Sequence, residues 1–364
     1  MAVKGSKSEI RRAAGRAIVC GFEGTAVDAE LREVLREVQP AGLIFFARNV
    51  ESPEQLRELS RELKALRPDD PLLLSVDQEG GRVARIKAPA TEWPTLRELG
   101  ASDDPELALR LGAALAREVR ALGIDVDFAP VLDVDTNPTN PVIGDRAFAR
   151  EPEAVARLGA AFVRGMQGEG VGACGKHFPG HGDTAVDSHL DLPRVEHDLE
   201  RLRRVEWPPF AAAIEAGVDA IMTAHVLVPA LDADHPGTLS PHALMPLREE
   251  LGFQGVIVSD DVEMKAVADR YTPAEIAERG LAAGIDCFLA CRHAERVIAL
   301  FEGIVKGVER GAVDASRLLD AEARVLAWRR RYWQPVSSDR SLGALGSELH
   351  AELAREISQR ARSA

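Results

Sequence analysis

No stretch of this sequence is apolar for long enough to cross a membrane. A membrane-spanning helix needs about 18 consecutive apolar residues, and every apolar run here is shorter. The N-terminus is basic, as in a secretory signal, but its apolar run from Ala17 to Phe22 is too short for one and contains Gly21. We interpret that run as a first strand. We therefore expect a cytoplasmic protein that has no membrane partner.

Cysteine is scarce, and positively charged residues are fewer than negatively charged ones. The four cysteines lie mostly in apolar runs, which predicts reduced thiols in the core. Cys287 and Cys291 have no matching second pair, so a metal or redox site is disfavoured. Lys and Arg number 45 against 58 Asp and Glu, a net charge of -13, which argues against a nucleic-acid partner. We expect a small-molecule partner and a monomer or weak homodimer.

Eight short apolar runs recur along the chain, each followed by a helical pattern. The runs are 16–20, 42–46, 72–76, 124–131, 172–176, 219–225, 255–260 and 284–290. Nearly continuous apolar character is typical of parallel strands that are covered on both sides. Helices are expected to begin at Ser52-Pro53 and Asp104-Pro105, and Gly123 is placed to end the second of them. This α/β alternation predicts a single (β/α)8 TIM-type barrel over residues 1–335, with a doubly wound open sheet as the alternative.

A C-terminal extension, residues 336–364, follows the barrel. One helix is expected from Ser347, with Leu349, Leu353 and Ile357 spaced for a single face. We expect this helix to dock on the barrel. The alternative is a helix that binds a partner or a second copy of the chain.

Chemistry in such barrels lies at the carboxyl ends of the strands. Polar residues at those predicted ends are Asp77, Asp133, Lys176-His177, His225 and Asp260. The two longest strand-to-helix connections follow Val131 and Lys176. Loops of that length in a compact domain are usually functional.

The connection 175–193 is the densest in side chains that carry chemistry. It contains His177, His181, Asp183, Asp187 and His189, and its glycines and prolines predict a loop. Two interpretations compete: a metal site, and acid/base catalysis by Asp187 and His189. An aspartate two residues before a histidine can accept its Nδ1–H and stabilise the imidazolium. Pro179 and Gly180 disfavour the helix that metal ligation by His177 and His181 would use.

Three further segments end in candidate groups. Asp260 ends a buried strand on the inward side, and Asp261 is expected to turn away and cap the next helix. Asp77 is placed to accept two hydroxyl groups of a substrate, with Arg85 bracing it or reaching the substrate. Gly80-Gly81 permits close approach of the backbone, although a turn with an ion pair explains this segment nearly as well. Arg146, in a turn-rich loop, suits bidentate recognition of an acyl oxygen or a carboxylate, although an Asp145–Arg146 surface feature explains that loop as well.

These segments together resemble glycoside hydrolase family 3, and specifically its short bacterial β-N-acetylglucosaminidase branch. The carrying motifs are DQEGGRV (77–83), NPVIGDRAF (140–148), KHFPGHGDTAVDSH (176–189) and SDDVEM (259–264). They occur in the family's order, and the likeness spans roughly residues 14–310. KHFPGHG followed by DSH is the most specific, since larger family members lack that local histidine dyad.

The resemblance implies a barrel enzyme that works by a two-step retaining mechanism without metal or cofactor. It places the nucleophile at Asp260 and the acid/base at His189, supported by Asp187. The sugar-binding roles that it implies fall on Asp77, Arg85, Arg146, Lys176 and His177. The implied reaction is removal of terminal β-GlcNAc from GlcNAc-1,6-anhydro-MurNAc peptides during peptidoglycan recycling.

Some features of the chain depart from the family or leave alternatives open. The branch more often shows LSM where this chain has VEM, so Glu263 is expected to add negative charge near the site. A histidine that has given up its proton is neutral, so either water or inorganic phosphate can be the acceptor. A β-glucosidase or β-xylosidase of the same family is a further alternative.

Overall fold

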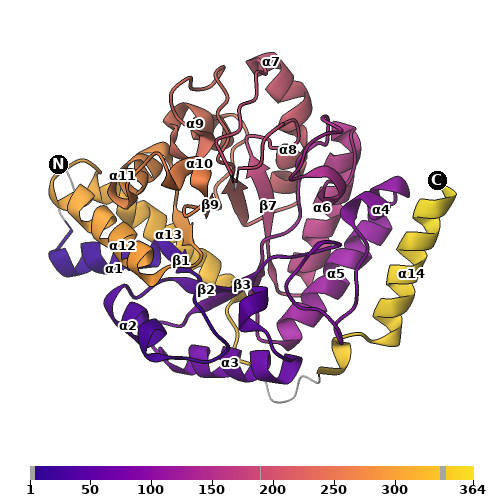
Figure 1. Cartoon of the computed structure of the whole chain (residues 1–364), viewed down its shortest axis with the longest axis horizontal. Coiled ribbons are helices and arrows are strands. Elements are labelled where there is room, and N and C mark those ends of the chain that lie inside the picture. The colour runs from indigo at the N-terminus through magenta and orange to yellow at the C-terminus, as the bar shows by residue number, and fades with distance from the viewer. Residues whose placement is uncertain (1–4, 189, 337–341) are drawn as a thin grey trace.

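Eight parallel strands close into a barrel, as the sequence predicts (Figure 1). The computed structural model describes residues 5–188, 190–336 and 342–364. The barrel strands are β1 Ile18–Cys20, β2 Gly42–Phe45, β3 Leu73–Val76, β6 Val126–Asp127, β7 Gly172–Phe178, β8 Ala220–Thr223, β9 Val256–Asp261 and β10 Cys287–Ala290. Their order around the barrel is β1-β10-β9-β8-β7-β6-β3-β2. Each of the eight predicted runs coincides with one strand, although β7 and β9 extend beyond the ends of their runs, and the open-sheet alternative is wrong.

Helices surround the strands. The longer ones are α1 Lys7–Arg16, α2 Ala29–Glu37, α3 Pro53–Ala65, α4 Leu96–Ala101, α5 Pro105–Ala121, α6 Pro152–Gly168, α8 Pro208–Glu215, α9 Pro241–Glu249, α11 Pro273–Ala283, α12 Ala294–Glu309, α13 Ala315–Tyr332 and α14 Glu348–Ser363. The short ones are α7 Leu199–Arg201, α10 Lys265–Ala268 and five 3-10 or π segments, η1 Ala47–Asn49, η2 Gly144–Arg146, η3 Leu202–Glu206, η4 Gly237–Leu239 and η5 Leu342–Ala344. In the part of the chain that the structure describes, none of these helices is both long and apolar enough to span a bilayer.

The predicted helix starts and stops follow from capping chemistry. The Ser52 side chain accepts the backbone N–H of Gln55 and so caps α3, which begins at Pro53. Asp104 does the same for α5 through the N–H of Glu106. Gly123 follows the end of α5 with φ of 87°, a conformation that glycine adopts without strain. The helix boundaries predicted here are confirmed.

Apolar side chains form two layers, one outside the strands and one inside the barrel. On β3, Leu74 faces the helices, whereas Leu73 faces the barrel interior. Close strand packing leaves no room at Gly42, where an added Cβ would lie 2.2 Å from the Leu73 carbonyl oxygen. All four cysteines are buried and free, as predicted.

Helix α13 closes the amino-terminal end of the barrel. Its Val325, Trp328 and Tyr332 belong to the interior apolar layer. Its arginines bind aspartates that lie just before strands. Arg317 reaches Asp286 before β10 at 2.9 Å, Arg329 reaches Asp70 before β3 at 2.5 Å, and Arg331 reaches Asp219 before β8 at 2.7 Å. One helix therefore joins strands from different sides of the barrel.

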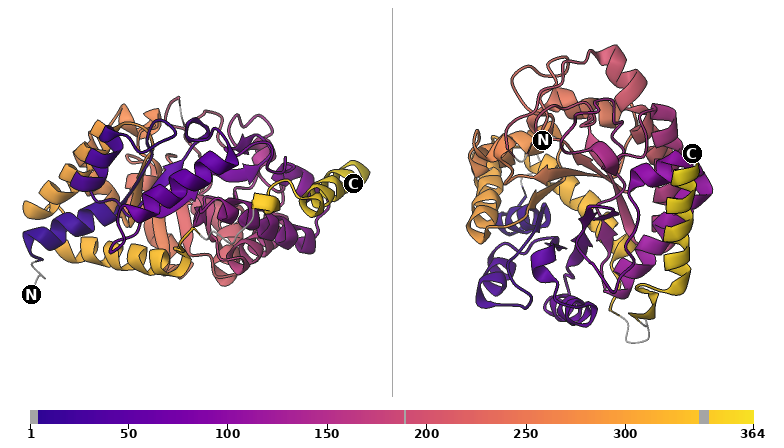
Figure 2. Two further views of the ribbon diagram at one scale, coloured as in Figure 1. Left: turned by 90° about the horizontal axis from the view of Figure 1, so that it is seen from below. Right: turned by 45° about the vertical axis from the view of Figure 1, so that its right-hand side comes forward.

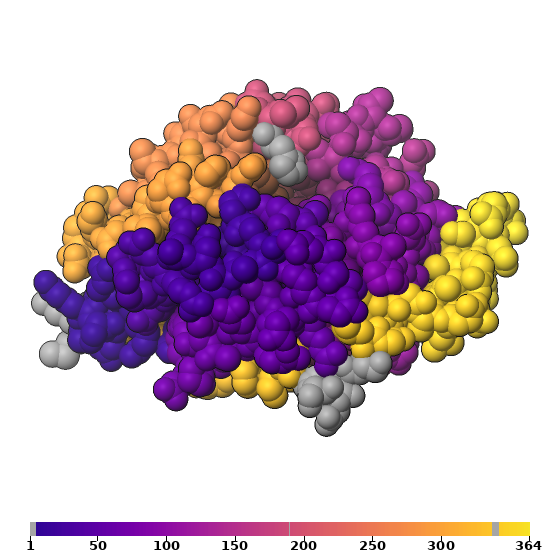
Figure 3. Space-filling view, turned by 60° about the horizontal axis from the view of Figure 1, so that its bottom comes forward, coloured from indigo at the N-terminus to yellow at the C-terminus, as the bar shows by residue number. Residues whose placement is uncertain are grey.

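Helix α14 lies on the outer side of the barrel against α4 and α5 (Figure 2). Figure 3 shows this C-terminal segment covering the flank beside the purple residues of α4 and α5. Its inner face holds His350, Leu353 and Ile357, and His350 Nδ1 lies 2.9 Å from Glu118 Oε1. Leu349, predicted to share that face, is 63% exposed. The buried face of the helix therefore differs from the predicted one by one position, with His350 in place of Leu349.

Candidate active site

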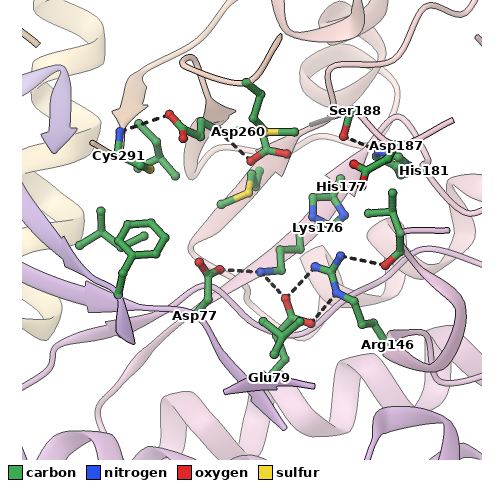
Figure 4. Close-up of a pocket in the computed structure, with 18 of the residues that line it drawn as sticks. Asp77, Glu79, Arg146, Lys176, His177, His181, Asp187, Ser188, Asp260 and Cys291 are labelled. Atoms are coloured by element: carbon green, nitrogen blue, oxygen red, sulfur yellow. Dashed lines mark hydrogen bonds and ion pairs between the residues drawn. The ribbon is translucent and has the colours of Figure 1, made fainter. Parts of the chain in front are cut away.

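The carboxyl ends of the strands surround a cavity of about 230 Å³ (Figure 4). Of the eight catalytic and sugar-binding residues that the family resemblance implies, seven line it: Asp77, Arg85, Arg146, Lys176, His177, Asp187 and Asp260. The eighth, His189, lies outside the described residues. Residues that are far apart in the sequence thus meet in one place.

One side of the cavity is a network of buried charges. Lys176 Nζ lies 2.7 Å from Asp77 Oδ1 and 2.6 Å from Glu79 Oε1. Arg146 donates Nε and Nη2 to the two oxygens of Glu79, both at 2.8 Å. Arg85 braces Asp77 more loosely, with 3.6 Å between Nη2 and Oδ2. The network contains both signs of charge, so it holds its groups in place without a large net charge.

Glu79 and Lys176 are ionised despite being 1% and 2% exposed. Burial alone would raise the pKa of Glu79, but Arg146 and Lys176 outweigh it and hold that pKa well below its usual range. Burial alone would lower the pKa of Lys176, but Asp77 and Glu79 hold it above its usual value. Each charge is therefore stabilised by its partners.

Glu79 was not singled out from the sequence. It lies in a hairpin of β4 Gln78–Gly80 and β5 Val83–Ala84, where the sequence indicated a turn at Gly80-Gly81. Gly80 and Gly81 make that turn with φ of 94° and 54°. Asp77 and Glu79 are two residues apart, and extended backbone places such residues on one side. That spacing was the available signal.

The histidine segment differs from the predicted loop at its start. Strand β7 continues through His177 to Phe178, with a cis peptide between Lys176 and His177. His177 Nδ1 lies 2.7 Å from Asp133 Oδ2, and Asp133 Oδ1 accepts the backbone N–H of His181 at 2.7 Å. Burial would raise the pKa of Asp133, but His177 and His181 outweigh it and lower it. Asp133 thus orients the ring of His177 within the cavity lining.

His181 is a buried neutral imidazole. Burial and the neighbouring His177 lower its pKa to about 4. Its Nδ1 lies 2.8 Å from Thr184 Oγ1, and its Nε2 lies 3.1 Å from Ser188 Oγ. This second contact ties the residue after Asp187 to the cavity wall. Among the described residues, no group of three or more His, Cys, Asp or Glu side chains is arranged to hold a metal ion.

The two adjacent acids at the end of β9 have different surroundings. Asp260 Oδ1 accepts the backbone N–H of Asp261 at 2.8 Å. Asp261 Oδ1 accepts the N–H groups of Glu263 at 3.0 Å and Cys291 at 3.2 Å. The predicted helix cap is wrong, because β9 includes Asp261 and α10 begins four residues later at Lys265. Asp261 instead joins the ends of β9 and β10.

Glu263 faces away from the cavity. Its carboxylate accepts the backbone N–H groups of Arg292 and His293 and lies 2.6 Å from His293 Nδ1. Glu263 therefore lies outside the cavity lining, and its negative charge acts on the site through the neighbouring Asp261. Its partners lie about 30 positions along the chain, so no local pattern indicates them.

Replacing Asp261 with asparagine is expected to stabilise the protein more at high pH than at low pH. Burial, with the nearby charges of Glu263 and Asp260, raises the pKa of Asp261 to about 7. Between its ordinary pKa of about 3.9 and this value the folded protein keeps a proton that the unfolded chain has lost, so stability falls as pH rises. Asparagine keeps the oxygen that accepts the hydrogen bonds and does not titrate, so it removes this loss of stability at high pH.

The expected gain in unfolding free energy is about 2 kcal/mol larger near pH 8 than near pH 5. Urea unfolding of both proteins at the two pH values measures it. Asp269→Asn, at an exposed acid nearby, serves as the control. A difference between Asp261→Asn and the parent that does not change with pH would contradict the argument.

Comparison with known proteins identifies the family of the chain. Residues 11–328 match the glycosyl hydrolase family 3 N-terminal domain. A β-hexosaminidase of Pseudomonas aeruginosa is 45% identical over 271 residues, which cover 74% of this chain and 80% of that protein. A solved family 3 β-N-acetylglucosaminidase from Paenibacillus sp. FPU-7 is 41% identical with a TM-score of 0.91, over 96% of this chain and 68% of that one.

A third relative is NagZ from Neisseria gonorrhoeae, solved in complex with N-trifluoroacetyl-D-glucosamine. It is 32% identical, with a TM-score of 0.77, over 95% of this chain and 98% of that one. Coverage, identity and fold all point to one assignment. The chain belongs to glycosyl hydrolase family 3, and it is a glycoside hydrolase of the β-N-acetylhexosaminidase type.

Proposed function

We propose that this enzyme removes terminal β-linked GlcNAc from GlcNAc-1,6-anhydro-MurNAc peptides in the cytoplasm, as a step of peptidoglycan recycling. The observation that carries the proposal is the gathering of seven candidate residues around one cavity at the carboxyl ends of the strands.

Asp260 acts in this proposal as the nucleophile. Its carboxylate attacks the anomeric carbon, the glycosidic C–O bond breaks, and a glycosyl ester of Asp260 forms. The Asp261 N–H holds Oδ1, which fixes the plane of the attacking group. Asp261 itself accepts the N–H of Cys291, the residue that follows β10, so the nucleophile is positioned by the ends of two neighbouring strands.

His189, supported by Asp187, supplies the proton to the leaving oxygen and later removes one from the acceptor. Asp187 lines the cavity, and the following residue, Ser188, is held by His181 at 3.1 Å. An aspartate that accepts the Nδ1–H of a histidine fixes its tautomer and stabilises the imidazolium. Water then attacks the anomeric carbon, gives its proton to His189 and releases Asp260.

The network of buried charges on one side of the cavity binds the sugar in this proposal. Asp77 accepts hydroxyl donors, and Arg85 and His177 donate to sugar oxygens from the same lining. Lys176 lines the cavity and also holds Asp77 in place. Arg146 has its Nε and Nη2 occupied by Glu79, so it contributes mainly by keeping the Glu79–Lys176 pair rigid. The sugar derivative in the Neisseria protein supports GlcNAc as the ligand of this site.

Product analysis tests the proposal. The enzyme is incubated with a GlcNAc-1,6-anhydro-MurNAc peptide in phosphate buffer and in a phosphate-free buffer, and the products are identified by mass spectrometry. We expect free GlcNAc and the anhydro-MurNAc peptide at equal rates in both buffers. GlcNAc-1-phosphate as the main product would replace water by phosphate as the acceptor. Faster cleavage of 4-nitrophenyl β-glucoside than of 4-nitrophenyl β-GlcNAc would overturn the choice of sugar.

A further inference from the structure

The segment that carries Asp187 and Ser188 leaves the barrel after β7 and returns before α7. Its two ends meet outside the cavity at Asp183 and His197. His197 Nε2 lies 2.9 Å from Asp183 Oδ2 and 3.8 Å from Glu206 Oε1. We name residues 184–196 the dyad loop, and the cluster of Asp183, His197 and Glu206 the loop base. None of the three base residues is in the cavity lining.

The loop base rests on a buried carboxylate. Glu206, at the end of η3, has a side chain that is 5% exposed. Arg201 donates Nε and Nη2 to Glu206 Oε1, both at 3.3 Å. Burial, only partly opposed by Arg201, raises the pKa of Glu206 to about 7. Gly180, where the chain leaves β7, has no space for a Cβ, which would lie 2.7 Å from Glu206 Cγ. The start of the segment is thus packed directly on the base.

Different parts of the barrel hold the two limbs of the segment. On the outgoing limb, Asp183 Oδ1 accepts the hydroxyl of Thr136, and the Thr184 carbonyl accepts the amide of Asn137. Both donors follow β6. On the returning limb, the Val195 N–H donates to the Leu227 carbonyl at 2.9 Å, beyond β8. His197 Nε2 and Asp183 Oδ2, 2.9 Å apart, bring the two limbs together where the dyad loop begins.

We propose that His197 is a positioning residue for proton transfer. By holding Asp183, it sets how the dyad loop lies over the cavity and where Asp187 and Ser188 stand in the cavity lining. This inference rests on the proposed acid/base role of Asp187 and His189. A loop closed at its base has fewer conformations than an open one, and a displacement of about 1 Å in a catalytic group costs up to about a hundredfold in rate.

Leaving-group dependence distinguishes this role from general damage to the fold. An aryl β-GlcNAc with a good leaving group, 2,4-dinitrophenolate, needs little protonation, whereas phenyl β-GlcNAc needs much. We expect His197→Ala to lower kcat by about tenfold on the phenyl substrate and by less than about threefold on the dinitrophenyl substrate. His197→Gln retains an N–H donor for Asp183, and we expect it to recover most of the loss.

Two further variants separate the possible outcomes. Arg270→Gln breaks an exposed 2.7 Å ion pair with Asp191 on the same loop, and we expect it to leave both rates unchanged. Asp187→Asn removes the proposed support of the acid, and we expect it to show the same leaving-group dependence as His197→Ala, only stronger. Thermal unfolding of all four variants confirms that they fold.

Equal losses on both substrates in His197→Ala, or no loss, would overturn the positioning role while Asp187→Asn still upholds the proposed function. The absence of leaving-group dependence in Asp187→Asn would overturn the proposed acid/base role, and the positioning role with it. No recovery in His197→Gln, despite normal folding, would also contradict the role given to the Asp183 contact.

Discussion

Asp260→Ala is expected to lower kcat/KM by about four orders of magnitude or more, with little change in thermal stability. Removing a covalent nucleophile eliminates the reaction path, and losses of this order follow such changes in other enzymes. Asp260 is half-buried at the end of β9, and its removal leaves the Asp261–Cys291 link between the strands intact. Steady-state kinetics on 4-nitrophenyl β-GlcNAc and a thermal melt measure both quantities.

Azide rescue and a control variant test this prediction further. Azide is small enough to enter the space left by the carboxylate, so it should restore turnover in Asp260→Ala and give a glycosyl azide of inverted configuration. Asp261→Ala serves as the neighbouring control and should retain far more activity. A dead Asp261→Ala beside an active Asp260→Ala would reverse the assignment within the pair.

Glu79→Ala is expected to have the largest effect on stability. It leaves Lys176 and Arg146 enclosed without the carboxylate that both of them contact at 2.6 to 2.8 Å. Breaking a buried ion pair by removing one partner typically costs about 3 to 5 kcal/mol, because the remaining charge stays desolvated. Urea unfolding measures the loss, and activity should fall with it because Lys176 also holds Asp77.

A matched exposed pair provides the control for Glu79→Ala. Arg157 and Asp103 lie 2.7 Å apart with both side chains about half exposed. Breaking that pair with Arg157→Gln should cost less than about 1 kcal/mol. Glu79→Gln, which keeps the shape of the side chain and loses its charge, should fall between these values. If Glu79→Ala lowered the free energy of unfolding no more than Arg157→Gln does, the buried charge network would not stabilise the fold.

The barrel could be predicted because its strands are covered on both sides and therefore read as apolar runs. The lengths of the strands could be predicted less well. The run 124–131 contains only the two ladder residues Val126 and Asp127. Pro130 follows closely and has no N–H to donate, and an isolated bridge between Val131 and Lys176 replaces a continuous ladder. The apolar pattern reports burial, and the buried chain beyond Asp127 still pairs with β7 without forming a regular strand, since the carbonyls of Ala129 and Pro130 accept the N–H groups of Cys174 and Lys176.

The candidate site was predicted unevenly for a similar reason. Motif residues such as Asp77 and Asp260 stand at strand ends, where the fold dictates their location. Glu79 was missed because its partner Arg146 is 67 positions away, and only the closed barrel brings them together. Asp261 was assigned to a helix cap because adjacent acids often have that role, whereas its partner Cys291 follows the next strand. Contacts between segments that are far apart in the sequence account for both errors.

The crossing of α13 over the amino-terminal end of the barrel has a consequence for biosynthesis. By the time β10 has left the ribosome, every strand and every candidate site residue has been made. Asp70, Asp219 and Asp286 then still lack their α13 arginines, and the interior layer lacks Val325, Trp328 and Tyr332. A nascent chain at that stage holds all the catalytic side chains but not the helix that closes the barrel. The enzyme therefore acquires its working geometry late, when α13 has been synthesised.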